Sequence, residues 1–162
     1  MKRDIPGPGQ ESVWDYPRPP AVLATNSHIR VIHAGVTIVD TIHATRVLET
    51  SQPPAFYLPP ADIQMAYFTR SKSTTMCEWK GHGVYWDLTV NGRTTPDVAW
   101  SYLAPTGGFA AITGYLAIYA QKVDACFVDD EQVTPNDGMF YGGWITSKVV
   151  GPFKGGPGTL GW

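Results

Sequence analysis

The sequence predicts a mainly β fold, an antiparallel curled sheet or open barrel with one short helix. The chain of 162 residues contains 17 glycines and 14 prolines, scattered through sequence of ordinary complexity. Such a distribution is typical of many short strands joined by tight turns. Three hairpin patterns and a single segment of helical character point the same way.

Three segments alternate apolar and polar residues, as half-buried strands do, and each has a turn signal near its centre. Asn91-Gly92 is the clearest signal, because both residues tolerate the positive φ that a two-residue hairpin turn requires. The predicted hairpins are residues 29–41, turning at Ala34-Gly35, residues 84–102, turning at Asn91-Gly92, and residues 123–134, turning near Asp129-Asp130.

The remaining elements are shorter. Residues 64–69, 46–50 and 115–119 are further strand candidates. The one predicted helix lies between Thr106, which would cap its first turn, and Gly114, which would end it. Phe109 and Ile112 share one face of this helix.

The chain divides into an arm and a body. Residues 1–22 are predicted as an extended arm, because five prolines between positions 6 and 20 exclude a helix. Trp14 and Tyr16 would pack the arm on the body, since large aromatic side chains bury much area per residue. Residues 23–162 have the length of a single compact β domain.

Composition limits the partners. The net charge is −2 with both signs interspersed, so no basic stripe predicts a nucleic-acid partner. The longest mostly apolar stretch, residues 109–120, is too short to span a membrane, and no membrane partner is expected. Cys77 and Cys126 form no C-x-x-C pair, which favours a reduced, cytoplasmic compartment and leaves a disulfide between them open.

Reactive side chains are densest in residues 74–81, where a thiol, a carboxylate, an amine and an indole follow one another. Cys77 is a candidate nucleophile, since a neighbouring Lys80 would favour its thiolate form. Alternatively, Cys77 is a small core residue at a strand end and Lys80 holds the turn before Gly81. Lys80 is also a candidate for contact with an anionic ligand.

Arg46 and Glu49 form a second candidate pair. In a strand they would point to opposite faces, whereas in a helical turn they would be neighbours. The alternative to a functional role is a plain ion pair or two solvated charges. In the functional interpretation Arg46, like Lys80, meets an anionic group, and Glu49 accepts hydrogen bonds or acts as a base.

Amphipathic aromatic residues supply the third candidate group. In residues 84–90 one face is apolar and would join the core, whereas Tyr85 lies on a polar and aromatic face. That face suits either the lining of a barrel mouth or a solvent-exposed surface. The ligand-binding candidates are therefore Arg46, Glu49, Tyr57, Lys80, Tyr85, Trp100 and Tyr102, and the catalytic candidates are Glu49, Cys77 and Lys80.

Several motifs are missing from the sequence. The four histidines lack the spacing of metal ligands, so neither a metal nor another cofactor is predicted. In the glycine-rich run of residues 151–159, Lys154 precedes the glycines and Pro157 prevents a following helix, unlike a phosphate-binding loop. This run is predicted to wrap Phe153 and Trp162 against the body.

Over nearly its whole length the chain resembles the family known as domain of unknown function 427. The segments that carry the resemblance are residues 11–19 (ESVWDYPRP), 46–50 (RVLET), 77–81 (CEWKG) with Tyr85-Trp86, 99–102 (AWSY), 114–119 (GYLAIY), 141–146 (YGGWIT) and 151–155 (GPFKG). The resemblance implies a compact β fold similar to the tent-like or open-barrel sheets that hold zinc in other families. Zinc is not carried over, because the paired C-x-x-C motifs are missing here.

The family is sometimes filed as nucleotidyltransferase-like. Such sites have Gly-Ser followed by an Asp-x-Asp pair that holds the catalytic metal, and this sequence contains neither. The leading hypothesis is instead a domain that binds a small, anionic molecule in a polar and aromatic pocket. A protein-interaction or homo-oligomeric module and a nucleotidyltransferase-like enzyme are the alternatives. No reaction is assigned, and whether the protein is an enzyme is left open.

Overall fold

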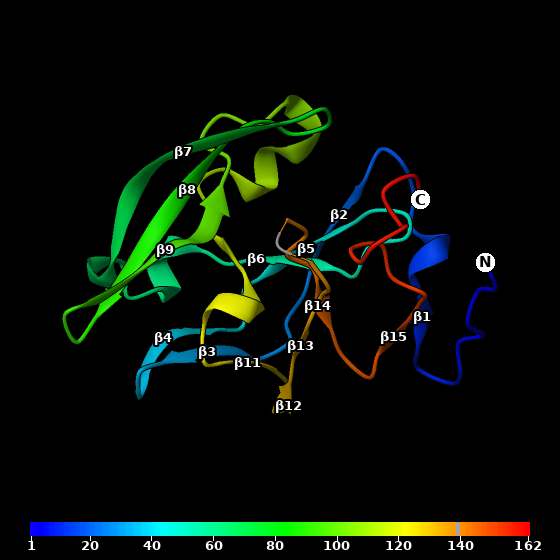
Figure 1. The fold of residues 1–162 in the computed structure, drawn as a ribbon, viewed down its shortest axis with the longest axis horizontal. Coiled ribbons are helices and arrows are strands. Elements are labelled where there is room, and N and C mark those ends of the chain that lie inside the picture. The colour runs from blue at the N-terminus through cyan, green and yellow to red at the C-terminus, as the bar shows by residue number, and fades with distance from the viewer. Residues whose placement is uncertain (139) are drawn as a thin grey trace.

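The computed structural model describes residues 1–138 and 140–162, and antiparallel strands dominate it as predicted (Figure 1). The first sheet has the strand order β10-β9-β8-β7 and contains the longest strands of the fold. Its members are β7 (Phe68–Cys77), β8 (Gly81–Val90), β9 (Arg93–Ser101) and β10 (Ala117–Ile118).

Two further sheets complete the body. The second has the order β12-β11-β3-β4, and the third has the order β2-β5-β6. Their members are β3 (Ile29–His33), β4 (Val36–Thr41), β11 (Ala125–Val128), β12 (Glu131–Gln132), β2 (Ala21–Ala24), β5 (Thr45–Leu48) and β6 (Ala55–Tyr57). A bridge between Leu58 and Leu116 connects the third sheet to the first.

The three predicted hairpins are confirmed, and their turns have the backbone that the sequence requires. Both turn residues have positive φ in each case, for example +52° at Asn91 and +76° at Gly92. The register of β8 and β9 shifts near Asp87, opposite Asp97, whose backbone N–H donates to the Asp87 carboxylate at 2.9 Å. Such a bulge increases the local twist. The sheets accordingly curl, although no closed barrel forms within the described residues.

Two element predictions need correction. The proposed strand at residues 64–69 begins with the 3-10 turn η3 (Met65–Tyr67), and strand pairing starts only at Phe68. The proposed helix is the 3-10 segment η4 (Gly107–Ile112), which is kinked at Phe109. Thr106 does not cap it, because its hydroxyl donates to the Trp79 carbonyl at 2.6 Å.

The other helical segments are single 3-10 turns: η1 (Val13–Asp15), η2 (Pro60–Asp62) and η5 (Ala120–Lys122). The first lies inside the arm, so the prolines there exclude an α-helix but still allow one tight turn. None of the helices in residues 1–138 and 140–162 is both long and apolar enough to cross a membrane.

The main core lies between the first and second sheets, which form opposite layers in Figure 1. Ile29 and Val31 of β3 pack in one cluster with Leu88 of β8. Trp144, at the start of β14 (Trp144–Ile145), is buried in the same cluster and donates its indole N–H to the Ile118 carbonyl at 2.8 Å. β14 pairs with β13 (Thr134–Pro135), which brings the later part of the chain onto the core.

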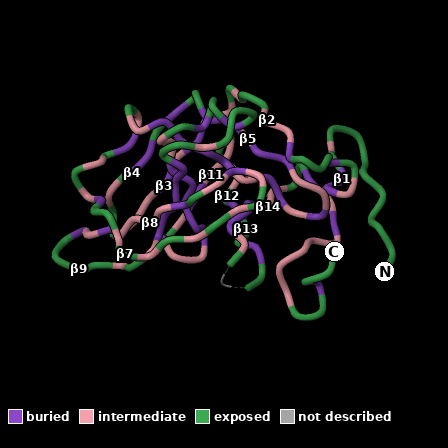
Figure 2. Tube along the Cα trace, turned by 90° about the horizontal axis from the view of Figure 1, so that it is seen from above, coloured by how far each residue is buried: buried purple, intermediate pink, exposed green. Residues whose placement is uncertain are grey.

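The arm joins the body through the far end of the chain. β1 (Glu11–Ser12) pairs in parallel with β15 (Val149–Val150), and Val13 and Tyr16 are buried beside them. The Trp14 indole donates to the Pro152 carbonyl at 2.9 Å, and its ring lies 5.5 Å from that of Trp162. Residues 1–9, by contrast, run exposed along the surface (Figure 2).

Candidate functional site

A cavity of about 270 Å³ lies between the first and third sheets. One face of the first sheet supplies most of its wall, because Tyr85 of β8 stands directly opposite Trp100 of β9. Cys77 ends β7 on the same side, and Tyr102 lies two residues beyond Trp100. Gly83 makes room for Tyr102, since a Cβ there would come within 3.3 Å of the tyrosine ring.

The third sheet supplies the facing wall. Val47 and Ala55 are paired across β5 and β6, and Glu49 and Tyr57 lie two residues further along on the same face. Residues 140–143 and Lys154 cover the remaining side. Gly142 lies so close to the Trp100 indole that a Cβ would collide with it, so the wall can close only with glycine at this position.

Aromatic rings form a connected surface inside the cavity. The ring of Trp100 lies 4.6 Å from that of Tyr119 and 6.2 Å from that of Tyr57. The Trp100 indole donates to the Tyr57 hydroxyl oxygen at 3.1 Å, and the Tyr119 hydroxyl donates to the Phe140 carbonyl at 3.1 Å. These bonds fix the rings, so the surface is formed before any ligand enters.

The cavity tyrosines stay protonated in the neutral pH range. Burial raises the pKa of Tyr57, Tyr102 and Tyr119 well above the ordinary value of 10, because a phenolate would lose its hydration. The hydroxyls of Tyr57 and Tyr102 can therefore donate hydrogen bonds to a ligand, whereas that of Tyr119 is already engaged with Phe140, and none of the three is available as a base.

Lys80 is the most buried charged residue of the site. It ends the turn between β7 and β8 and lines the cavity although the residue is only 8% exposed. Its ammonium lies 5.7 Å from the ring centre of Tyr102 and 5.6 Å from that of Phe109, within the range of cation–π attraction. Within residues 1–138 and 140–162, no acidic side chain lies within ion-pair distance of this ammonium.

The other charged groups at the cavity have partners or face solvent. The Glu49 carboxylate lies 3.7 Å from the guanidinium of Arg18, and Glu78 is exposed. The Lys154 ammonium lies 5.3 Å from the ring centre of Tyr141 and donates to the Trp162 carbonyl at 3.4 Å. The interior of the cavity thus has a positive end, at Lys80.

The two cysteines are free and lie in different surroundings. Cys77 is partly exposed and packs against the cluster that contains Trp100 and Tyr102. Cys126 is buried in the main core, where burial raises the pKa of its thiol to about 12. A disulfide between them, left open by the sequence, does not form here.

The cavity brings together six of the seven ligand-binding candidates and all three catalytic candidates. Arg46 is the exception. On β5 it points away from the face that carries Val47, and its guanidinium binds Glu11 at 2.9 Å. That hydrogen bond holds the pKa of Glu11 below its ordinary value of 4.5. Arg46 therefore belongs to an ion pair with the arm, whereas the alternative considered for it was an ion pair with Glu49, which instead lies near Arg18.

Several cavity residues were not predicted as site residues. Tyr119 and Tyr141 were visible in the sequence as amphipathic aromatics, but no local pattern separates them from core residues. Gln52 carries no sequence signal, and the segments that contain Thr75 and Lys154 attracted attention without either residue being predicted to line the site. Their positions depend on contacts between segments far apart in the chain.

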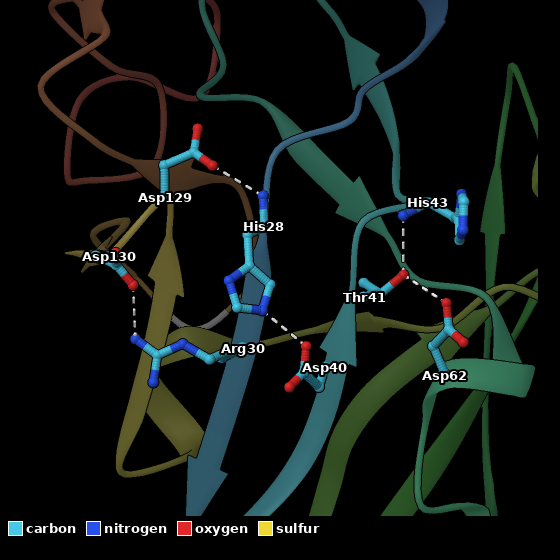
Figure 3. A network of polar contacts seen from close by, with 8 residues as sticks. All are labelled: His28, Arg30, Asp40, Thr41, His43, Asp62, Asp129 and Asp130. Atoms are coloured by element: carbon cyan, nitrogen blue, oxygen red, sulfur yellow. Dashed lines mark hydrogen bonds and ion pairs between the residues drawn. The ribbon is translucent and has the colours of Figure 1, made fainter.

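A second polar network lies on β3, β4 and the turn after β11 (Figure 3). His28 binds Asp40 at 2.7 Å through its ring, and its backbone N–H donates to Asp129. Arg30 binds Asp130 at 3.1 Å. These exposed contacts hold the edges of the second sheet together. In the part of the chain that the structure describes, no three His, Cys, Asp or Glu side chains gather as a metal site would require.

Comparison with known proteins gives one family. No curated protein matches the chain. A family model described as "Domain of unknown function (DUF427)" matches residues 21–129, which run from β2 to the turn after β11. This match covers well over half of the chain, including Lys80, Cys77 and the aromatic wall of the cavity. The chain therefore belongs to the DUF427 family.

Proposed function

We propose that the cavity binds a small organic molecule that carries an anionic group, with Lys80 as the residue that meets the charge. The observation that carries this proposal is a lysine that is only 8% exposed and whose ammonium has no acidic partner among the described residues, at the wall of an aromatic cavity. A largely covered lysine loses part of the hydration of its ammonium, and the two rings beside it compensate only in part. An anionic ligand would complete the pairing.

The aromatic wall suits the organic part of such a ligand. Tyr57, Trp100 and Tyr102 line the cavity but are almost fully covered, so they support its wall from behind. The partly exposed Trp79, Tyr85 and Tyr141 offer the apolar ring surface that a ligand can contact. A volume of about 270 Å³ lies just below the range of ordinary ligand pockets and corresponds to a compact metabolite.

The convergence of these aromatics on a partly open cavity favours ligand binding over a protein-interaction surface. A docking face would expose the rings over a flat area, whereas here the two sheets and residues 140–143 cover most of their surface. Glu49, held near Arg18, is positioned to accept hydrogen bonds from the ligand or to act as a base.

Binding can be tested with phenyl phosphate, which combines a ring with an anionic group. Inorganic phosphate and phenol, which correspond to the two parts of this molecule, serve as controls. Each compound is titrated into the purified full chain, and binding is measured by calorimetry. We expect phenyl phosphate to bind more tightly than either half. Lys80→Met should weaken its binding by about tenfold or more, because a charge-assisted contact is lost.

Lys148→Met is the control, since Lys148 is exposed and lies outside the cavity. Replacing a buried charge by an apolar side chain of similar length should leave the thermal midpoint unchanged or raise it. Unchanged affinity in Lys80→Met would contradict the proposal. So would wild-type protein that binds phenyl phosphate no better than inorganic phosphate and shows no retained ligand by native mass spectrometry.

A further inference from the structure

Cys77 occupies the one position on the cavity wall at which the chain presents a thiol. It ends β7 opposite Gly81, the first residue of β8, and is only partly covered. It packs against the cluster of buried residues that contains Tyr57 and Tyr102. The sulfur therefore lies among rings that would hold a flat ligand, and both phenol hydroxyls stay protonated.

Lys80 gives independent reason to place a ligand here. It is more than nine-tenths buried, lines the same cavity, and has no side-chain hydrogen bond or ion pair within the described residues. Its ammonium and Cys77 share Tyr102 as a neighbour. An anion drawn to Lys80 would thus be held in the small space that Cys77 borders.

We propose that Cys77 is a nucleophile that forms covalent adducts with anionic α,β-unsaturated carbonyl compounds bound in the cavity, with Lys80 selecting for their negative charge. This inference rests on the proposed function, because it requires the same anionic ligands to enter. It adds the reactive group and the chemical class on which that group acts.

The addition balances without a further reactant. The Cys77 sulfur forms a bond to the β-carbon of the conjugated double bond, and the π electrons move onto the carbonyl oxygen as an enolate. The proton lost from the thiol returns, through solvent, to the α-carbon. No leaving group departs and nothing is oxidised or reduced. The flat, conjugated ligand fits a site walled by rings, and its charge lies toward Lys80.

Two maleimides of equal intrinsic chemistry test this selectivity. N-ethylmaleimide is neutral, whereas maleimidoacetic acid carries a carboxylate, and both add a thiol to a conjugated double bond. Labelling rates of the native protein are measured by intact-mass spectrometry with peptide mapping, and each is divided by the rate with free 2-mercaptoethanol, which is a thiol without another charged group. Cys126 is an internal control, because its burial should prevent labelling until the protein is unfolded.

We expect Cys77 to prefer the anionic reagent by about tenfold after this correction, as one ion pair in a partly buried site would give. Lys80→Met should abolish the preference and Lys80→Arg should retain it. Lys72→Met, which removes an exposed lysine from the strand that carries Cys77, should leave the charge preference unchanged. Thermal midpoints confirm that each variant is folded, and Lys80→Gln replaces Lys80→Met if that variant does not fold.

The inference is overturned if Cys77 shows no charge preference, or if the preference survives the loss of Lys80. Titration of Cys77→Ser with phenyl phosphate separates the two proposals, because this binding does not require the thiol. If Cys77→Ser binds phenyl phosphate but Cys77 of the wild-type protein shows no charge preference, the proposed function stands and the covalent chemistry is removed. If neither the binding nor the charge preference is observed, both proposals are removed.

Discussion

Trp100 is fixed in the cavity by contacts with residues that are distant in the sequence. Its indole donates to Tyr57, its ring packs on Tyr119, and the backbone of Gly142 lies against its outer edge. Each contact comes from a different segment. Because the packing is this close, the shape of the cavity depends on single atoms at these positions.

Gly142→Ala should therefore damage both stability and binding. A methyl group at this position overlaps the Trp100 indole, which would have to shift out of its hydrogen bond with Tyr57 and its packing on Tyr119. We expect a loss of about 1–3 kcal/mol in the free energy of unfolding, measured by urea denaturation, and weaker phenyl phosphate binding. Gly108→Ala is the matched control, because nothing lies near its added methyl group. Equal stability of the two variants would contradict the close contact.

Buried tyrosines should make the protein sensitive to alkali. Tyr102 keeps its proton in the folded state above the ordinary pKa of 10, whereas the unfolded chain releases it there. The folded pKa is raised, so this stabilisation is complete below pH 10 and is lost as the pH rises further. Urea midpoints should fall between pH 10 and 11.5, and absorbance at 295 nm should rise on unfolding. The urea midpoint of Tyr102→Phe should fall less steeply with pH, and a slope equal to that of the wild type would contradict this explanation.

Hairpins were predictable because their signals are local. Asn91-Gly92 and Asp129-Asp130 specify their turns by the backbone conformations they tolerate. The strand prediction for residues 64–69 failed because the 3-10 turn and the strand that follows it share one apolar pattern, which does not show where the turn ends and the strand begins. Strand alternation also placed Tyr85 on a polar and aromatic face, but did not decide whether that face lined a pocket or met solvent. Applied strictly to Arg46 and Glu49, the same alternation would have put their side chains on opposite faces.

The rest of the site could not be predicted from local patterns. Lys154 and Gly142 reach the cavity through β13, β14 and the final wrap, whose positions follow from packing on the core. Lys80 was recognised by its chemistry, but its burial depends on Thr106 and Phe109 folding back over the turn. Contacts between segments far apart in the chain leave no recognisable residue spacing in a single sequence.

The turn of the first hairpin can be improved. Ala34 has φ of +50°, a left-handed conformation that costs an alanine about 1 kcal/mol. Ala34→Asn would give the Asn-Gly pair that already forms the turn at Asn91. Because Ala34 is exposed and only its backbone makes hydrogen bonds, the free energy of unfolding should rise by about 0.5–1 kcal/mol. Urea denaturation measures this free energy. Ala34→Val, which strains the turn further, should lower it.

Both ends of the chain meet in one small layer beside the third sheet. β1 lies against β15, Asp4 and Gly151 exchange two hydrogen bonds, and Trp14 packs on Trp162. The family match ends at residue 129, whereas the cavity is closed by residues 140–143 and Lys154. The matched region therefore holds Cys77 and Lys80, and the segments beyond it complete the wall of the cavity.

Removing the arm should loosen the segment against which it packs. Deleting residues 1–16 removes the buried Val13 and Tyr16 and leaves β15 without its partner strand. We expect the free energy of unfolding to fall by more than about 3 kcal/mol. Hydrogen exchange in residues 147–153 should accelerate, whereas β3 should stay protected. Deleting residues 1–2 alone, which are exposed, should be nearly neutral, and equal effects of the two deletions would refute the role of the arm.

The pairing of β1 with β15 also sets an order of events during synthesis. Residues 11–12 leave the ribosome early, but their partner strand at residues 149–150 is made only after nearly all of the body. Until then Val13 and Tyr16 have no Val149 to cover them, so the nascent arm presents an apolar surface to solvent or to a chaperone. A ribosome that stalls before residue 149 would thus hold a chain whose hairpins can form while its first strand still lacks a partner.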